Sequence, residues 1–316
     1  MPNFDGGHYF LTVLLPVRGE LVEDPRVAGI VTSHVEALRQ VLVALPTALQ
    51  TPATERIGLN SPFARDRRTH FARFSVIDDV TFNGRGQRDP IKVALLGPKP
   101  WQTDPVDALP CAYLLFVADF DAASGDTAAL DSYLTGLWAV MAPELREILI
   151  HCRGHDRLSD AAGFCRLIRD CQVETTMPFN DYWSTAPSLP TLDIKSLLIP
   201  VAIAAVVLLL GIVIALFGGR AGVWLLVAGL VGLVVTVVLA WRRVVAAGMA
   251  PFPTAPRSDL PSVLKALYLQ QQFIRFAIRM QGAEPAALHA GFGDFLRQHR
   301  PEDVAAPSQH AGTVRS

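Results

Sequence analysis

Two long, uncharged apolar runs constrain the fold of this chain more than any other feature. Residues 197–217 read LLIPVAIAAVVLLLGIVIALF, and residues 223–241 read VWLLVAGLVGLVVTVVLAW. At 1.5 Å per residue, helices of these lengths would extend over about 31 Å and about 28 Å, close to the ~30 Å thickness of a bilayer core. Only the five residues GGRAG separate the two runs. We therefore predict an antiparallel transmembrane hairpin within residues 195–243.

The hairpin is expected to be an anchor and not a channel. Neither run contains an acidic, amide or histidine side chain, whereas transporters normally need such groups inside the membrane. Small residues four positions apart would let the two helix backbones approach closely. These predicted packing residues are Gly211, Ala215, Ala228 and Gly232. The alternative is that they reflect only the small residues common in membrane helices.

Basic residues predict the orientation of the hairpin. Lys195 precedes the first run and Arg242 and Arg243 follow the second, while the turn holds Arg220 alone. The positive-inside rule then places both termini in the cytoplasm, in a two-pass protein of the inner (plasma) membrane. The amino terminus, MPNFDGGHYF, lacks the pattern of a signal peptide. In a reducing compartment, we expect free thiols at Cys111, Cys152, Cys165 and Cys171.

Charge is concentrated outside the apolar runs. Charged residues make up 18% of the chain, below the roughly 25% of a typical soluble protein. Residues 1–194 carry 17 basic and 24 acidic side chains, and residues 242–316 carry 9 basic and 5 acidic ones. Because nucleic-acid binding relies on basic surfaces, this low and uneven charge leads us to expect no nucleic-acid partner for the chain.

Residues 1–190 are predicted to form a cytosolic α+β domain. Their hydrophobic periodicity indicates strands at 8–17, 69–77, 112–120 and 171–177, and helices at 25–45, 130–150 and 161–170. A short strand at 91–95 is a further expectation. This β-α-β-β-α-β order is that of the ferredoxin-like split-βαβ motif, with one antiparallel sheet and helices on a single face. The open face would be solvated, covered by a ligand, or packed against a second copy in a dimeric α+β barrel.

Strand alternation assigns side chains to the two faces of this sheet. We expect His70 on the helix-covered face and Arg73 on the open face, while Val173 would face the helices. An Arg73–Glu174 ion pair is not expected, because their strands would be about 14 Å apart, although one ligand could touch both. The predicted ligand-binding residues are therefore Arg73, Glu174, Thr176 and His70.

Four segments carry a resemblance to a known family. Residues 61–64 (SPFA), 69–74 (THFARF), 113–116 (YLLF) and 173–176 (VETT) resemble a largely uncharacterised bacterial domain that can accompany haem peroxidase or catalase-like lipid-oxidising modules. The resemblance extends over about residues 8–183. It implies a ferredoxin-like fold and a setting in lipid or peroxide chemistry, and it transfers no catalytic residue. No peroxidase or catalase module is present in this sequence.

Recognised catalytic motifs are missing from the sequence. It contains no GxSxG, no GxxxxGK[ST] and no HExxH motif, so nucleophilic catalysis is not supported and the sequence favours a non-enzymatic protein, with an enzyme as the alternative. His70 as a haem ligand with Arg73 beside bound peroxide is the sharpest alternative, but alternation separates the two. The segment from His151 to Asp156 invites a metal site, although Gly154 indicates a helix end between the histidines. We predict no metal and no cofactor, with haem as the alternative.

Residues 258–299 are predicted to form two amphipathic helices, at 260–280 with Ser258 as N-cap and at 285–299, followed by a disordered tail at 301–316. Their basic character favours two alternatives equally. One is binding to anionic lipid at the membrane surface, and the other is docking onto the acidic amino-terminal domain.

Three functions follow from these features. The first is a membrane-anchored binding protein that presents an open sheet face to a lipid-like ligand or to a partner such as a membrane-associated enzyme. The second is a haem- or peroxide-dependent oxidoreductase acting on membrane lipids. The third is a structural membrane scaffold, in which substitutions on the open face would have no effect.

Overall fold

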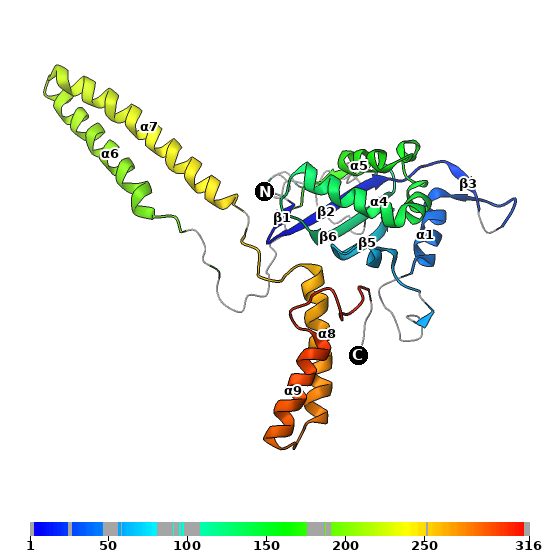
Figure 1. Cartoon of the computed structure of the whole chain (residues 1–316). Coiled ribbons are helices and arrows are strands. Elements are labelled where there is room, and N and C mark those ends of the chain that lie inside the picture. Colours follow the sequence, from blue (N-terminus) through cyan, green and yellow to red (C-terminus); the bar gives the residue numbers. More distant parts are fainter. Residues whose placement is uncertain are drawn as a thin grey trace. The chain divides into compact units, whose positions relative to one another are not determined.

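The computed structural model describes residues 3–24, 27–46, 56–57, 59–80, 91, 95, 97, 108–175, 187, 191–250 and 252–312. The chain divides into two compact units. One comprises Asn180–Ala255 with Met1, and the other comprises Pro2–Phe179 with Pro256–Ser316. The described residues form a five-stranded antiparallel sheet, a two-stranded hairpin and seven α-helices, which is an α+β architecture (Figure 1).

The main sheet is built on three long strands. Its order is β1-β2-β6-β5, and β7 pairs with β2 beside β1. The strand bounds are β1 Phe4–Asp5, β2 His8–Pro16, β5 Thr69–Ile77, β6 Tyr113–Asp121 and β7 Gln172–Val173. The predicted positions of β2, β5 and β6 are confirmed to within one residue. The predicted fourth strand is present only as β7 in the described residues, and the strand expected at 91–95 lies largely outside them.

Three helices pack on one face of the sheet. They are α1 (His34–Ala44), α4 (Thr127–Leu149) and α5 (Ala161–Asp170), with short 3-10 turns η1 (Pro62–Arg65) and η2 (His155–Arg157). The prediction for α5 is confirmed. The prediction of a helix over 25–45 is wrong for its first part, because β3 (Leu21–Glu23) pairs with β4 (Val31–Ser33) before α1 begins. Ser33 caps α1 by accepting a hydrogen bond from the Glu36 amide, which fixes this start.

The hydrophobic core lies between these helices and the sheet. Every second residue of the strands points into it, as Leu11, Val13 and Leu15 do from β2. The ring of Tyr133 on α4 stacks on Phe120 of β6, with 3.6 Å between ring centroids. Because alternate strand residues point into the core, the remaining strand residues lie on the open face of the sheet.

The structure corrects the predicted side-chain faces at two strands. In β5, the pairing to β6 shifts register between Thr69 and Phe71, and this β-bulge takes His70 out of the regular alternation. His70 therefore lies with Asp121 on the open face of the sheet, and not on the helix-covered face. In β7, Gln172 pairs with Val13 and bonds the buried Tyr9 hydroxyl, so the predicted faces of this strand are reversed.

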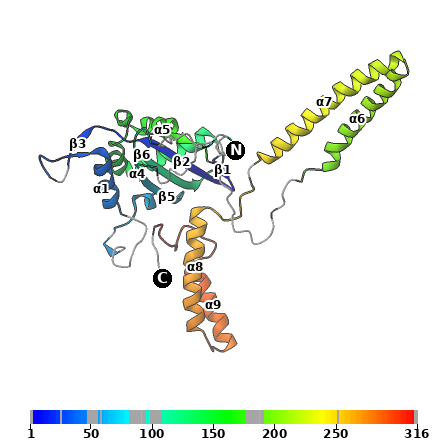
Figure 2. The ribbon, with the colours of Figure 1, turned by 180° about the vertical axis from the view of Figure 1, so that it is seen from behind.

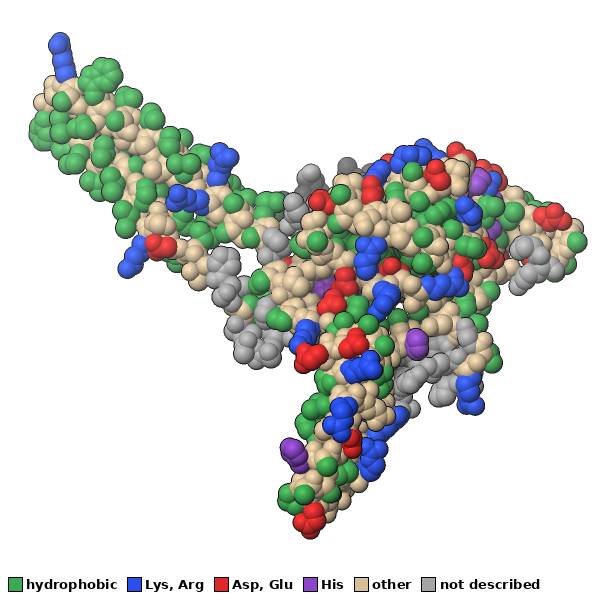
Figure 3. All heavy atoms as spheres, in the orientation of Figure 1, with side chains coloured by type: hydrophobic (Ala, Val, Ile, Leu, Met, Phe, Trp, Pro, Cys, Tyr) green, Lys and Arg blue, Asp and Glu red, His purple; other side chains and the backbone are tan. Residues whose placement is uncertain are grey.

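The unit of residues 180–255 contains two long apolar helices, α6 (Ile194–Leu216) and α7 (Arg220–Gly248). The most apolar 18-residue segments of the two helices have mean hydropathies of 3.2 and 2.8. Only 11% and 6% of these segments, respectively, is buried. Both helices have the length and composition of a membrane span. Hydrophobic side chains cover their surface in Figure 3.

The carboxy-terminal part forms α8 (Leu260–Arg279) and α9 (Pro285–His299), which lie side by side in both views (Figures 1 and 2). Asp259, and not the predicted Ser258, caps α8, because its carboxylate accepts from the Ser262 amide. Aromatic rings join the two helices at Phe273, Phe276, Phe292 and Phe295.

Lys265 joins α8 to α9 and to the segment that follows α9 by hydrogen bonds. Its side chain is buried, and Nζ donates to the carbonyl oxygens of His299 at 2.7 Å and Pro307 at 2.8 Å. Residues 300–312 form neither helix nor strand, yet the Ala311 carbonyl accepts from the Asn60 amide group at 3.0 Å. These bonds connect the carboxy-terminal segment to the domain that carries the sheet.

Candidate functional site

A pocket of about 320 Å³ lies along β5. Its apolar walls come from the end of α1, from η1 and from residues on both faces of β5, and residues 311–312 form part of its rim. The pocket-lining hydrophobic side chains include Leu42, Leu45, Phe63, Phe71, Ala72 and Phe74. Its volume is in the range of about 300–1,000 Å³ that small-molecule sites occupy.

Arg73 supplies the positive charge of this pocket. It pairs with Val117 across the β5–β6 ladder, on the open face, as the alternation predicts. Its side chain is exposed, and it forms no ion pair with any described acidic residue. An exposed guanidinium on a residue that lines an apolar pocket is suited to bind a carboxylate or phosphate group.

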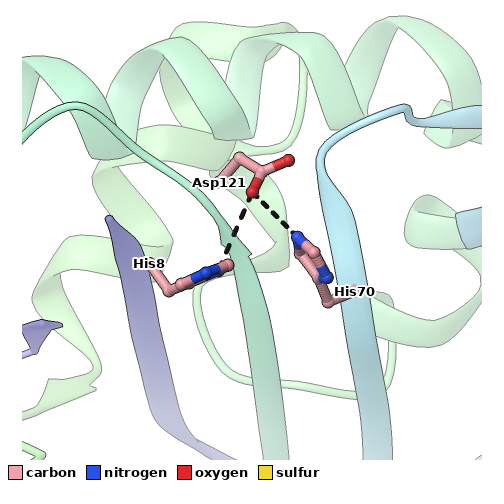
Figure 4. A group of neighbouring side chains, drawn as sticks. All are labelled: His8, His70 and Asp121. Atoms are coloured by element: carbon pink, nitrogen blue, oxygen red, sulfur yellow. Dashed lines mark hydrogen bonds and ion pairs between the residues drawn. The ribbon is translucent and has the colours of Figure 1, made fainter. Parts of the chain in front are cut away.

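His70, His8 and Asp121 form a polar cluster next to the pocket. They come from β5, β2 and β6, and Figure 4 shows the three side chains pointing toward one another. His70 Nε2 lies 2.8 Å from Asp121 Oδ1, and His8 Nδ1 lies 3.7 Å from the same oxygen. The two imidazole rings meet edge to face with 4.8 Å between centroids. His70 also lines the pocket, so the cluster borders it.

Strand register explains why this cluster forms. His8 is the first residue of β2 and Asp121 is the last residue of β6, and antiparallel pairing places them directly opposite each other. The bulge in β5 then turns His70 toward Asp121. Sequence analysis selected His70 but missed the other two. The available signal was their position, since each is a polar residue at the end of an apolar strand.

Asp121 also contacts α8. Its second carboxylate oxygen, Oδ2, accepts a hydrogen bond from the Leu260 amide at 2.9 Å. Leu260 is the first residue of α8, where helical amides lack partners within the helix. A single carboxylate therefore joins two histidines of the sheet to the start of a helix more than a hundred residues later in the sequence.

Glu174, another predicted ligand-binding residue, does not join this site. Glu174 follows β7 and is exposed, while β6 and β2 lie between β5 and β7. The structure therefore does not bring Glu174 close to Arg73, in line with the expected strand separation. Thr176 lies outside the described residues.

The predicted membrane packing residues lie at different places in the α6–α7 pair. A Cβ atom at Gly211 would overlap the backbone of Leu226, and Ala215 lies against Gly222. Gly232 is in ordinary contact range of Ala204, whereas Ala228 is exposed. The tight contacts on α7 are made by Gly222 and Gly229, which sequence analysis did not select.

A second pair of histidines is buried elsewhere in the domain. His34 Nδ1 and His151 Nδ1 are 2.9 Å apart, so one ring donates to the other. Desolvation and the neighbouring His34 and Arg18 lower the pKa of His151 to about 4. The pKa of His34 is also lowered, mainly by burial. Neither ring lines the pocket along β5, and these histidines are assigned a structural role.

The cysteines are free thiols. Burial raises the pKa of Cys152 to about 12 and also raises the pKa values of Cys165 and Cys171. A thiol with a raised pKa is a poor nucleophile at neutral pH, so these side chains are not suited to thiolate chemistry.

Comparisons with protein-family models, with curated proteins and with solved structures find no match to this chain.

Proposed function

We propose that this chain is a membrane-anchored protein that binds a lipid-like acidic amphiphile in the pocket along β5. The observation that carries the proposal is the exposed side chain of Arg73, a residue that lines an apolar pocket of about 320 Å³ and forms no ion pair with an acidic residue in the described part of the chain. Arg73 binds the anionic head group, and the apolar walls bind the hydrocarbon chain. Burial of the chain contributes about 0.8 kcal/mol for each methylene removed from water.

The second part of the proposal is the anchor. α6 and α7 form a transmembrane hairpin, with both chain termini on the cytoplasmic side of the inner membrane. Support comes from their length, their hydropathy and the basic residues Lys195, Arg242 and Arg243 at the outer ends. An anchor of this kind keeps the binding domain at the surface where amphiphiles are concentrated.

The finer fold assignment belongs to the same proposal. In a ferredoxin-like domain, the first and third strands are central, and the second and fourth are at the edges. The order β7-β2-β6-β5 within the sheet supports this assignment, with β2 and β6 as the central strands. β5 is then an edge strand, which leaves its outer side available to a ligand.

Equilibrium binding of a matched ligand pair tests the function. The full-length protein in zwitterionic nanodiscs is titrated with radiolabelled dodecanoate and dodecanol, and binding to empty nanodiscs is subtracted. We expect saturable binding of dodecanoate and about tenfold weaker binding of dodecanol. Arg73→Gln should remove this preference, because an ionic hydrogen bond is worth about 1.5–3 kcal/mol. Equal binding of both ligands by the unmodified protein would contradict the proposal.

Two controls keep the result specific. Arg166 is an exposed arginine on α5 away from the pocket, so Arg166→Gln should leave the preference intact. Phe71→Ser should weaken the binding of both ligands, because Phe71 lines the pocket and half of its side chain is exposed. Val173 is 40% exposed on β7 outside the pocket, so Val173→Ser should have no effect.

A further inference from the structure

We infer that His8, His70 and Asp121 bind one divalent transition-metal ion. Each residue offers one ligand atom, and these atoms all lie within 4.8 Å of one another. The inference stands on this geometry alone and does not depend on the binding of an amphiphile.

The distances between the ligand atoms fit a metal ion. In a tetrahedral zinc site with bonds of about 2.0–2.1 Å, neighbouring ligand atoms are about 3.3 Å apart. Here the distance from Asp121 Oδ1 to His70 Nε2 is 2.8 Å, and the distance to His8 Nδ1 is 3.7 Å. These two values bracket the required spacing, and the two histidine nitrogens lie within 4.8 Å of each other, so the histidine rings must move closer together to coordinate one ion.

The supporting contacts of the cluster are those of a metal site. The strand backbones fix all three residues, and the Leu260 amide holds Asp121 Oδ2, which leaves Oδ1 directed at the histidines. A hydrogen bond to the far oxygen of a coordinating carboxylate is a common way to orient it. Asp119, on the same face of β6, lies 3.8 Å from His8 Nδ1 and adds negative charge.

The site is sheltered but reachable. His8 is buried, whereas the side chains of His70 and Asp121 are 18% and 20% exposed. A metal ion can therefore enter from the side of His70. The ion binds a neutral imidazole, so a doubly protonated ring must first release one proton to solvent, and affinity falls as the pH is lowered.

The ligand set indicates the class of metal. Two imidazoles and one carboxylate are typical of zinc and of other divalent first-row ions that keep one or more positions open. Because His70 lines the pocket along β5, an open position would lie close to whatever the pocket holds. The Asp121–Leu260 bond further predicts that metal binding stabilises the attachment of α8 to the sheet.

Zinc titration of the full-length protein, stripped with a chelator and kept in mild detergent, tests the inference. We expect one zinc per chain and a higher thermal midpoint with zinc, because a ligand that binds only the folded state stabilises it. His70→Gln and Asp121→Asn should each weaken binding at least tenfold. His289 is exposed on α9, and His289→Gln is the matched control that should bind as the unmodified protein does.

Two outcomes would overturn the inference. One is the lack of stoichiometric zinc binding by the unmodified protein, a result that requires no variant to fold. The other is binding that survives in folded His70→Gln but is lost in His151→Gln, which would assign the metal to the buried His34–His151 pair. Dodecanoate binding is measured separately, so failure of the metal site is distinguishable from failure of the pocket.

Discussion

His34 Nδ1 lies 2.9 Å from His151 Nδ1, which joins the first residue of α1 to the segment that follows α4. Both side chains are buried, and only a pair with one Nδ1 proton between the rings can keep this hydrogen bond. A second Nδ1 proton would leave two N–H donors facing each other and would place an imidazolium near Arg18, at the start of a helix where positive charge is unfavourable.

This pair predicts acid-induced loss of stability. The pKa of His151 falls from its ordinary 6.5 to about 4 in the folded protein, so between these values the unfolded chain binds more protons. The contribution of neutral His151 to the free energy of unfolding is therefore fully present above pH 6.5. It decreases by about 1–3 kcal/mol as the pH falls toward 4. Thermal unfolding between pH 4 and 8 measures it. His151→Gln should flatten this dependence, and an unchanged slope would assign the effect to other groups.

Asp66 is predicted to be important for stability. This buried carboxylate accepts from the Thr69 hydroxyl at 2.8 Å and the Arg68 amide at 3.1 Å, and Thr69 also bonds the buried Tyr133 hydroxyl. Asp66→Ala should lower the free energy of unfolding by about 2–3 kcal/mol, because buried donors lose their acceptor. Denaturant unfolding measures the loss.

The control for Asp66 is an exposed ion pair. Asp170 accepts from Arg157 at 2.8 Å, and both side chains are more than half exposed. Asp170→Ala should cost less than about 1 kcal/mol. An equal loss in the free energy of unfolding for the two substitutions would show that the Asp66 hydrogen bonds contribute no more to stability than an exposed ion pair does.

The α6–α7 pair should tolerate a larger side chain at Ala228 but not at the adjacent Gly229. A Cβ atom at Gly229 would come within 2.5 Å of the Leu208 backbone, whereas Ala228 is exposed. Gly229→Leu should therefore separate the helices, and Ala228→Leu should not. Oxidative cross-linking of Ala204→Cys with Gly232→Cys reports the packing, because Gly232 faces Ala204 at 3.6 Å. A cross-link that forms equally in both backgrounds would contradict this arrangement.

The proposed topology predicts which cysteines an impermeant thiol reagent reaches on intact cells. Ala221→Cys, at the turn between α6 and α7, should be labelled from outside. Thr254→Cys, beyond α7, should be labelled only after lysis; both positions are exposed. Labelling of Thr254→Cys and protection of Ala221→Cys would reverse the orientation, and equal labelling of both would exclude a membrane hairpin.

Periodic segments of this chain were predictable from sequence. The strands β2 and β6 are long, mostly apolar segments, β5 alternates between more and less buried side chains, and α5 has one apolar face, so their hydrophobic pattern identifies them. The start of α1 was not predictable by the same means, because Val27, Ile30 and Val31 fit a helical spacing although Val31 is in β4. Tertiary pairing with β3 overrides that local pattern.

The site was predictable only in part. Arg73 follows from alternation along β5, but a bulge leaves no mark in the hydrophobic pattern, and a one-residue shift moves His70 to the other face. The partnership of His8 with Asp121 depends on the exact register between distant strands. On α6, the predicted residues Gly211 and Ala215 do lie at tight contacts. The tight contacts on α7 are seven residues apart, at Gly222 and Gly229, and the four-residue spacing considered from sequence missed these two.

Photoaffinity labelling tests the central claim most directly. A fatty acid with a diazirine on its chain is added to the full-length protein in nanodiscs and irradiated, and adducts are located by mass spectrometry. We predict adducts in residues 42–46 and 61–74, around the pocket, in addition to any background on α6 and α7. Excess dodecanoate and Arg73→Gln should remove the pocket adducts and leave that background. Adducts confined to residues 194–248 would contradict the account.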